Sequence, residues 1–154
     1  MRPRLLDLYC GAGGAAMGYH RAGFDVVGVD HKPQPRYPFE FIQADALEFM
    51  AAGGWRGHDA IHASPPCQGY SALRCLPWLR DREYPMLIEP TRAALRRTGR
   101  PYVIENVERA PLKKGLLLCG RSFGLPVYRH RQFESSELLF SLGHLAHDVV
   151  IGHG

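Results

Sequence analysis

A cysteine on a proline-stiffened loop is the side chain in this sequence best suited to covalent chemistry. Cys67 lies in the octapeptide SPPCQGYS, residues 64–71, directly after an apolar strand predicted over 59–63. Proline fixes φ and has no N–H, so Pro65 and Pro66 exclude the interior of a helix or a central strand. The pattern predicts a thiol held in a defined direction at the carboxyl end of a strand, where open α/β sheets bind ligands. The alternative is a Pro-Pro turn with an incidental cysteine.

A glycine-rich turn forms a second candidate site. The segment DLYCGAGG, residues 7–14, ends a predicted strand and precedes a helix predicted over 15–22. Glycines let the backbone approach a ligand closely, and a helix N-terminus offers N–H groups to an anion. The next predicted strand, 24–29, leads to Asp30, whose carboxylate could accept hydrogen bonds from ribose hydroxyls. The G-x-G-G spacing lacks the full dinucleotide fingerprint. It suits a dinucleotide, S-adenosylmethionine or a tight turn without a ligand.

Two further acids follow predicted strands. Asp45 comes after a strand predicted over 39–44. It could receive an adenine amino group, cap the helix predicted over 46–52, or do both. Glu105 follows a strand predicted over 101–104, where a glutamate is commonly a surface residue or a cap. Both acids are expected at the same edge of the sheet as the cysteine loop.

Two arginines alternate near the end of the recognisable pattern. Arg129 and Arg131 lie in a strand predicted over 127–133. Since positions two apart share one face of a strand, both side chains are expected to point the same way. The alternative is a solvated face.

Alternating strands and helices predict an α/β fold with a doubly wound, mostly parallel sheet. A helix is predicted over 86–97, a further strand over 116–118, and a mobile loop over 68–81. The 154 residues are 45% hydrophobic and 22% charged, which is typical of one soluble domain. There is no apolar stretch of about 18 residues and no signal-peptide core, so we expect a cytoplasmic protein with reduced cysteines. The net charge of +4 permits a nucleic-acid partner.

Taken in order over residues 4–133, these motifs resemble those of the cytosine carbon-5 methyltransferases. The resemblance includes DLYCGAGG, the Pro-Cys-Gln core of SPPCQGYS, the Glu-Asn-Val segment at 105–107 and the Arg-x-Arg pair at 129–131. It implies a Rossmann-like S-adenosylmethionine-dependent methyltransferase fold. The implied reaction transfers a methyl group from S-adenosylmethionine to carbon 5 of cytosine in DNA, with bacterial or phage restriction-modification as its setting.

The resemblance also assigns roles to single residues. Cys67 would add to carbon 6 of the base as a nucleophile, and Pro66 would shape its loop. Glu105 would act as a carboxylic acid at ring nitrogen 3, Arg131 would hold the base carbonyl oxygen, and Arg129 would be the first member of the arginine pair. The glycine turn and Tyr9 would wrap the methionine end of the cofactor, with the ribose and adenine at the two strand-end aspartates. The full cofactor set is Asp7, Tyr9, Gly11, Gly13, Gly14, Asp30 and Asp45.

Beyond Phe133 the sequence departs from the family pattern. Family members continue into a target-recognition region and a C-terminal helix, so we expect a C-terminally truncated methyltransferase. Residues 1–140 would form the catalytic domain and 141–154 a tail that begins a missing region, which a second chain could supply. The DNA cytosine would be flipped out of the duplex. The tail histidines lack a partner cysteine in the sequence, so no metal site is expected.

Three other functions fit parts of the sequence. An RNA cytosine-5 methyltransferase of the same superfamily would share these motifs. A catalytically incomplete module could bind cofactor or DNA without turnover. A nicotinamide-dependent enzyme could use the glycine turn, but it would leave the Pro-Pro-Cys-Gln loop unexplained.

Overall fold

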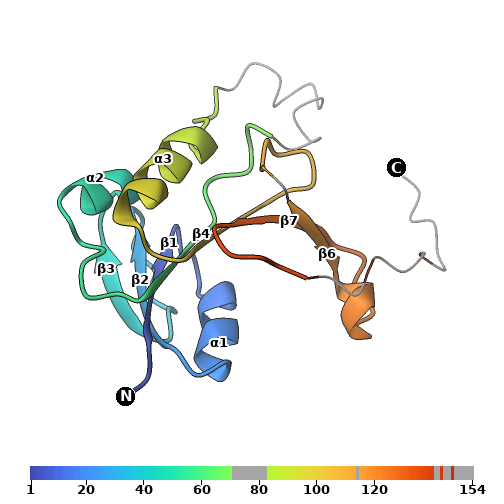
Figure 1. Ribbon diagram of the computed structural model, residues 1–154, viewed down its shortest axis with the longest axis horizontal. Helices are drawn as coiled ribbons and strands as arrows, with labels where there is room; N and C mark the ends of the chain where they lie inside the picture. The colour runs from blue at the N-terminus through green and yellow to red at the C-terminus, as the bar shows by residue number, and fades with distance from the viewer. Residues whose placement is uncertain (71–82, 114, 141–142, 144–146, 148–154) are drawn as a thin grey trace.

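A central β-sheet organises the chain in the computed structural model, which describes residues 1–70, 83–113, 115–140, 143 and 147. The described part contains seven strands, which pair in the order β3-β2-β1-β4-β5-β7-β6 (Figure 1). The strands are β1 (Arg4–Leu8), β2 (Asp25–Asp30), β3 (Glu40–Gln43), β4 (Ala60–Ala63), β5 (Tyr102–Asn106), β6 (Leu116–Cys119) and β7 (His130–Ser135). The helices are α1 (Gly14–Arg21), α2 (Ala46–Ala51), α3 (Ile88–Thr98) and the 3₁₀ helix η3 (Gly120–Phe123).

The first five strands of the sheet are parallel, and β7 runs antiparallel to both of its neighbours. Leu8 at the end of β1 pairs with Val29 of β2 on one side and Ala63 of β4 on the other. Ala63 in turn pairs with Ile104 of β5. The carboxyl ends of four strands therefore lie along one edge. The strand order reverses between β1 and β4, the point where such sheets bind ligands.

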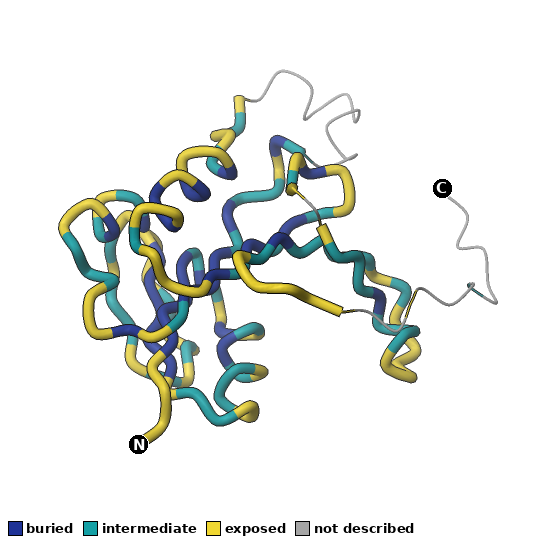
Figure 2. Tube along the Cα trace, in the orientation of Figure 1, coloured by how far each residue is buried: buried dark blue, intermediate teal, exposed yellow. Residues whose placement is uncertain are grey.

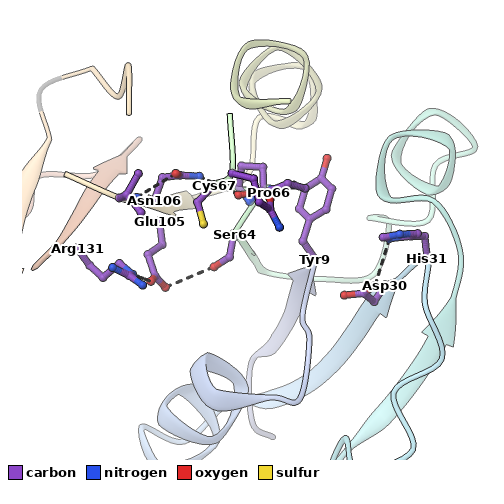
Figure 3. A pocket seen from close by; sticks show the side chains of 12 residues that line it. Tyr9, Asp30, His31, Ser64, Pro66, Cys67, Glu105, Asn106 and Arg131 are labelled. Carbon is purple, nitrogen blue, oxygen red and sulfur yellow. Dashed lines mark hydrogen bonds and ion pairs between the residues drawn. The ribbon is translucent and has the colours of Figure 1, made fainter. Parts of the chain in front are cut away.

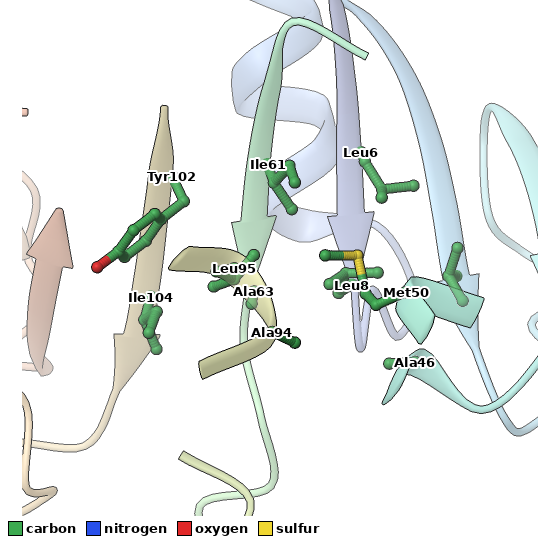
Figure 4. Close-up of a cluster of buried hydrophobic side chains, with 11 residues drawn as sticks. Leu6, Leu8, Ala46, Met50, Ile61, Ala63, Ala94, Leu95, Tyr102 and Ile104 are labelled. Atoms are coloured by element: carbon green, nitrogen blue, oxygen red, sulfur yellow. The ribbon is translucent and has the colours of Figure 1, made fainter. Parts of the chain in front are cut away.

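The helices cover the two faces of the sheet unequally. On one face α2 and α3 pack over β1, β4 and β5, and on the other α1 packs near β1 and β2 (Figure 1). The larger core buries Leu6, Leu8 and Ile61 of the strands against Met50 and Leu95 of the helices (Figure 4). A fully buried leucine contributes about 2 kcal/mol. Figure 2 shows this burial concentrated in the central strands.

The alternation of side chains along β1 places a polar residue on the face of the sheet that α1 covers. Leu6 and Leu8 belong to the core under α2 and α3, whereas Leu5 packs with Ala16 of α1. Successive side chains of a strand point to opposite faces. Asp7 therefore shares the α1 face with Leu5 and is nevertheless only 1% exposed.

A buried ion pair fastens α3 to β7. Arg92 donates from Nε and Nη2 to the two carboxylate oxygens of Glu134, each at 2.8 Å. The two residues are 1% and 3% exposed. Arg92 also donates to the carbonyl of Pro111, and the backbone N–H of Lys113 donates to Glu134. Burial alone would raise the pKa of Glu134, but these hydrogen bonds and the charge of Arg92 hold it below its usual value.

The predicted strands and helices are present, but two strand boundaries that bear on the site are wrong. The strand predicted over 101–104 extends to Asn106 as β5, so Glu105 lies within it. The strand predicted over 127–133 begins instead at His130. Its partner β6 ends at Cys119, which pairs with His130, and the chain then turns into η3 at Gly120. Residues 127–129 consequently lack a neighbouring β6 segment to pair with. No helix within the described ranges is long and apolar enough to cross a membrane.

Candidate active site

A cavity of about 280 Å³ lies at the carboxyl edge of the sheet, where β1, β2, β4 and β5 end (Figure 3). The proposed nucleophile and the carboxyl end of β5 line it together with residues from the ends of β1 and β2. The lining residues are Tyr9, Asp30, His31, Ser64, Pro65, Pro66, Cys67, Gln68, Glu105, Asn106, Val107 and Arg131. One cavity therefore unites motifs that are separated along the sequence.

The cysteine loop is held at both ends. The N–H of Ser64 continues the sheet by donating to the carbonyl of Leu8 at 3.1 Å. The buried amide of Asn106 then donates from Nδ2 to the carbonyl of Pro65 at 2.8 Å. After the thiol, the N–H of Tyr70 donates to the carbonyl of Cys67 at 2.9 Å. The half-buried Cys67 is thus presented to the cavity by a fixed backbone, and Asn106 is a positioning residue that the sequence analysis did not single out.

Glu105 and Arg131 form an ion pair in the cavity wall. Arg131 Nε lies 3.2 Å from Glu105 Oε1, and both side chains are 24% exposed. Ser64 Oγ donates to Glu105 Oε2 at 3.4 Å, on the side away from the arginine (Figure 3). Arg131 also donates from Nη1 to the carbonyl of His130. These described contacts leave Nη2 of Arg131 able to donate to a ligand in the cavity.

A buried histidine lies behind this carboxylate. His62 Nδ1 is 2.8 Å from Asp7 Oδ1, and the two residues are 2% and 1% exposed. A carboxylate only accepts hydrogen bonds, so Nδ1 donates to Asp7. Nε2 then faces Ser64 Oγ at 3.5 Å and Glu105 Oε2 at 3.8 Å. In the sequence His62 lies within the apolar strand predicted over 59–63, and a histidine at that place, just before the cysteine loop, is the signal that points to this role.

The opposite end of the cavity is formed by Asp30, His31 and Tyr9. The buried Asp30 carboxylate accepts the N–H of Gly11 at 3.1 Å and that of Lys32 at 3.0 Å. His31 Nδ1 lies 3.3 Å from the same carboxylate. Tyr9 stands between this end and the cysteine loop, and its hydroxyl is 2.8 Å from Thr91 Oγ1 (Figure 3). Burial raises the pKa of the Tyr9 hydroxyl, so it stays protonated.

The glycine turn depends on backbone conformations that favour glycine. Gly13 has φ +87° and caps the start of α1, and a Cβ there would come within 2.7 Å of Pro38 Cδ. Gly11 has φ +51°, but a Cβ there would meet nothing within 4 Å. The turn therefore packs tightly against the segment containing Pro38 at one glycine and borders open space at the other.

The sequence matches the family model described as C-5 cytosine-specific DNA methylase over residues 3–114. This chain belongs to that family.

Two curated proteins from bacteria are similar in sequence to this chain. Type II methyltransferase M.XorII of Xanthomonas oryzae pv. oryzae is 29% identical over 164 residues, which cover 97% of this chain and 35% of that protein. Type II methyltransferase M.FnuDI of Fusobacterium nucleatum is 26% identical over 112 residues, covering 68% and 32%. The chain thus spans about a third of the length of each relative.

A solved structure confirms the fold. The Entamoeba histolytica methyltransferase EhMeth superposes with a TM-score of 0.63 over 95% of this chain and 56% of its own, at 15% identity. This agrees with the Rossmann-like α/β architecture and the doubly wound, mostly parallel sheet.

Several candidate residues of the methylase-family chain lie outside the cavity lining. Arg129 precedes β7 and is exposed, so the prediction that it shares a strand with Arg131 is wrong. Asp45 caps α2 by accepting the N–H groups of Leu47 and Glu48, which confirms the capping alternative. Asp7 pairs with the buried histidine. The remaining members of this group are Gly11, Gly13 and Gly14.

Cys10, the cysteine of the glycine turn, is much less reactive than an ordinary thiol. Cys10 is 8% exposed, and burial together with the charges of Asp7 and Asp30 raises the pKa of its thiol to about 12. Since the thiolate is the reactive form, Cys10 is a poor nucleophile beside the cavity-lining Cys67. Of the loop predicted over 68–81, the structure describes residues 68–70. The rest of that loop, including Cys75, lies outside the described residues.

Proposed function

We propose that this chain carries the catalytic half of an enzyme that methylates carbon 5 of cytosine in DNA, with S-adenosylmethionine as methyl donor. The observation that carries the proposal is the single cavity lined by Cys67, Glu105 and Arg131 at one end and by Tyr9 and Asp30 at the other. A nucleophile, an acid and a cation at one end suit a heteroaromatic base. A buried acid at the other suits a hydroxyl-bearing cofactor.

The residues at the cofactor end fit this donor. Asp30 is held at the strand end by two backbone N–H groups, and the carboxylate has further lone pairs to accept ribose hydroxyls. The space above Gly11 is open, so a ligand could approach the backbone there. Tyr9 offers a ring face between the two ends. S-adenosylmethionine supplies the methyl group, and the chain's residues hold it and prepare the base.

At the base, the proposed chemistry is nucleophilic catalysis. The Cys67 thiolate forms a bond to carbon 6, and the electron pair of the 5,6 double bond moves so that carbon 5 becomes nucleophilic. Glu105 gives a proton to ring nitrogen 3 and so neutralises the charge that develops in the ring. After methyl transfer, water takes the proton from carbon 5, the carbon–sulfur bond breaks to release the Cys67 thiolate, and ring nitrogen 3 returns its proton to Glu105, which restores the aromatic ring.

Arg131 has two roles in this scheme. Without a base it pairs with Glu105 through Nε. With a base bound, its Nη2 donors can hold the carbonyl oxygen, since guanidinium presents donors in a fixed fork.

The Asp7–His62 pair positions Glu105 in this proposal. Asp7 orients the imidazole so that Nε2 faces Ser64 and Glu105. The pair is too deeply buried to touch the base, so its role is to hold the acid and its serine partner in place.

Covalent trapping tests the function directly. The chain is mixed with S-adenosylmethionine and duplex DNA containing 5-fluorocytosine in many sequence contexts, because fluorine blocks the final elimination. We expect a denaturation-resistant adduct that requires the cofactor, is absent in Cys67→Ser and persists in the control Cys10→Ser. An adduct that survives Cys67→Ser would contradict the assignment of the nucleophile.

The same assay separates the alternatives. An adduct on 5-fluorocytosine RNA but not on duplex DNA would favour an RNA methyltransferase. Cofactor binding by calorimetry with no adduct on either nucleic acid, in protein shown to be folded by circular dichroism, would contradict catalysis by this chain and favour a binding module.

A further inference from the structure

Outside the cavity, three metal-binding side chains converge at the far end of the β6–β7 hairpin. Cys119 ends β6, His130 begins β7, and the two are paired in the sheet. His147 approaches them from the segment beyond the sheet. One ligand atom from each of the three residues lies within 4.8 Å of the others. Along the sequence the tail histidines have no cysteine near them, which argued against a metal site. In the folded chain Cys119 lies beside His147, so that argument no longer applies.

Both distances that involve His147 match those between two ligands of one tetrahedral ion. Cys119 Sγ lies 3.5 Å from His147 Nε2, and His130 Nε2 lies 3.3 Å from the same nitrogen. Zinc bond lengths of about 2.3 Å to sulfur and 2.05 Å to nitrogen, at tetrahedral angles, place S···N at about 3.6 Å and N···N at about 3.3 Å. Two of the three spacings are thus those of ligands on one zinc ion, and the third pair lies within 4.8 Å.

A hydrogen bond to Glu108 directs the Nε2 lone pair of His130 toward the cluster. His130 Nδ1 lies 3.0 Å from the carboxylate of Glu108, so Nδ1 carries the proton and Nε2 of the neutral ring presents its lone pair to the cluster. Zinc-ligating histidines are oriented by such carboxylates. His147 Nε2 lies close to both Cys119 Sγ and His130 Nε2, but this nitrogen carries only one proton or one lone pair. It therefore cannot make a full hydrogen bond to both groups at once.

The surroundings also suit a bound ion. Cys119 is 1% exposed, and its thiol donates weakly to the carbonyl of Val127 at 3.8 Å, which leaves sulfur lone pairs for the cluster. The ring of Tyr128 packs edge-on against that of His147 at 4.7 Å between centroids and holds it in place. One thiolate and two imidazoles select zinc over magnesium or calcium, which prefer oxygen ligands.

We propose that Cys119, His130 and His147 bind a Zn²⁺ ion as three of its tetrahedral ligands, with Glu108 orienting His130. Binding converts the Cys119 thiol to a thiolate and releases its proton. The ion fastens the segment containing His147 to the hairpin. It also anchors the first residue of β7, next to the Arg131 of the cavity wall. The site is structural and does not depend on the proposed methylation activity.

Metal content and spectroscopy test this site. The full chain is stripped with a chelator, reloaded with Zn²⁺ or Co²⁺, and analysed by mass spectrometry and absorption. We expect one ion per chain and a thiolate-to-cobalt charge-transfer band in the near ultraviolet. Reloading with zinc should raise the melting temperature, because a ligand that binds only the folded state stabilises it.

Variants separate a metal site from a hydrogen-bonded cluster. His147→Ala, which lies outside the sheet and is expected to fold, should weaken zinc binding at least tenfold, and Cys119→Ala should abolish the charge-transfer band. Glu108→Gln should weaken binding by about tenfold to a hundredfold. The matched control Cys10→Ser, another buried cysteine, should keep both properties. Less than a tenth of an ion per chain, or binding that His147→Ala and Cys119→Ala leave unchanged, would overturn the proposal.

Discussion

At the scale of single residues, chemistry is decided by what surrounds each side chain. Cys10 and Cys67 are the same residue type at the same edge of the sheet. Burial and two carboxylates raise the pKa of Cys10, whereas the cysteine loop presents Cys67 to the cavity. Likewise, His62 acquires an orientation only because Asp7 accepts the proton of Nδ1.

The two thiols should differ sharply in alkylation. With its pKa at about 12, Cys10 should react with iodoacetamide at pH 8 on the order of a thousandfold more slowly than an ordinary thiol, because so little thiolate is present. Cys67 should be labelled first. Peptide mass spectrometry over a time course measures both rates. The denatured chain, in which both cysteines should react alike, is the control, and equal rates in the folded chain would contradict the prediction.

His62→Asn tests the positioning role. The Asn amide can still donate to Asp7, so the fold should persist, but the contact of Nε2 with Ser64 and Glu105 is lost. The Ser64 hydroxyl loses a hydrogen-bond partner, which is worth about 1 kcal/mol, so trapping on 5-fluorocytosine DNA should slow about fivefold. The pH dependence of trapping should also change, which a purely structural role would not cause. An unchanged rate and pH profile would exclude the role.

At the scale of elements, α3 does more than cover the sheet. Its apolar stripe packs on β4 and β5, while Arg92 reaches past that stripe to Glu134 on β7. This pair ties the helix to an antiparallel strand that the core under α2 and α3 does not include. The strand that presents Arg131 to the cavity is therefore held by a buried charge pair.

Breaking this pair should cost far more than removing a surface charge from the same helix. Arg92→Met leaves the Glu134 carboxylate buried without its partner, so the free energy of unfolding should fall by about 3–5 kcal/mol. Arg97→Met, on the exposed side of α3, should change it by about 0.5 kcal/mol or less. Urea unfolding followed by circular dichroism measures both. Similar values for the two variants would show that the ion pair does not hold α3 in place.

At the scale of the whole molecule, the reversal of strand order makes the cavity. The chain goes outward from β1 to β3, returns to β4 and continues to β5 on the other side. Asp30 at the end of β2 and Glu105 at the end of β5 thus flank the central strands and face the same cavity. A ligand that spans the cavity should stabilise the entire sheet.

Cofactor binding should raise the melting temperature through the Asp30 end of the cavity. Saturation at about a hundredfold over the dissociation constant stabilises the folded state by about 2.7 kcal/mol. Asp30→Ala should reduce the rise caused by S-adenosylmethionine, while Asp25→Ala, the same residue type at the other end of β2, should leave it intact. Scanning calorimetry with and without cofactor gives both values. A full rise in Asp30→Ala would place the cofactor elsewhere.

The sequence by itself determined the alternation of strands and helices, because hydrophobic period and glycine or proline breaks are local properties. It also placed Cys67, Asp30 and Glu105 at the carboxyl ends of strands, although Asp30 and Glu105 still belong to β2 and β5. It placed the start of the last strand wrongly, since pairing with β6 decides where β7 begins. It could not choose between a cap and a ligand contact for Asp45, because the two differ only in the surroundings of one carboxylate.

Only the tertiary structure decided which distant residues meet. His62 and Asp7 are brought together by the register of β1 on β4, and Arg92 meets Glu134 because α3 lies over the sheet. Cys119 and His147 converge at the end of the hairpin. Such contacts depend on strand order, register and side-chain direction together. Spacing along the chain records none of these, so the motifs indicated the family while the packing produced the cavity and the metal-binding cluster.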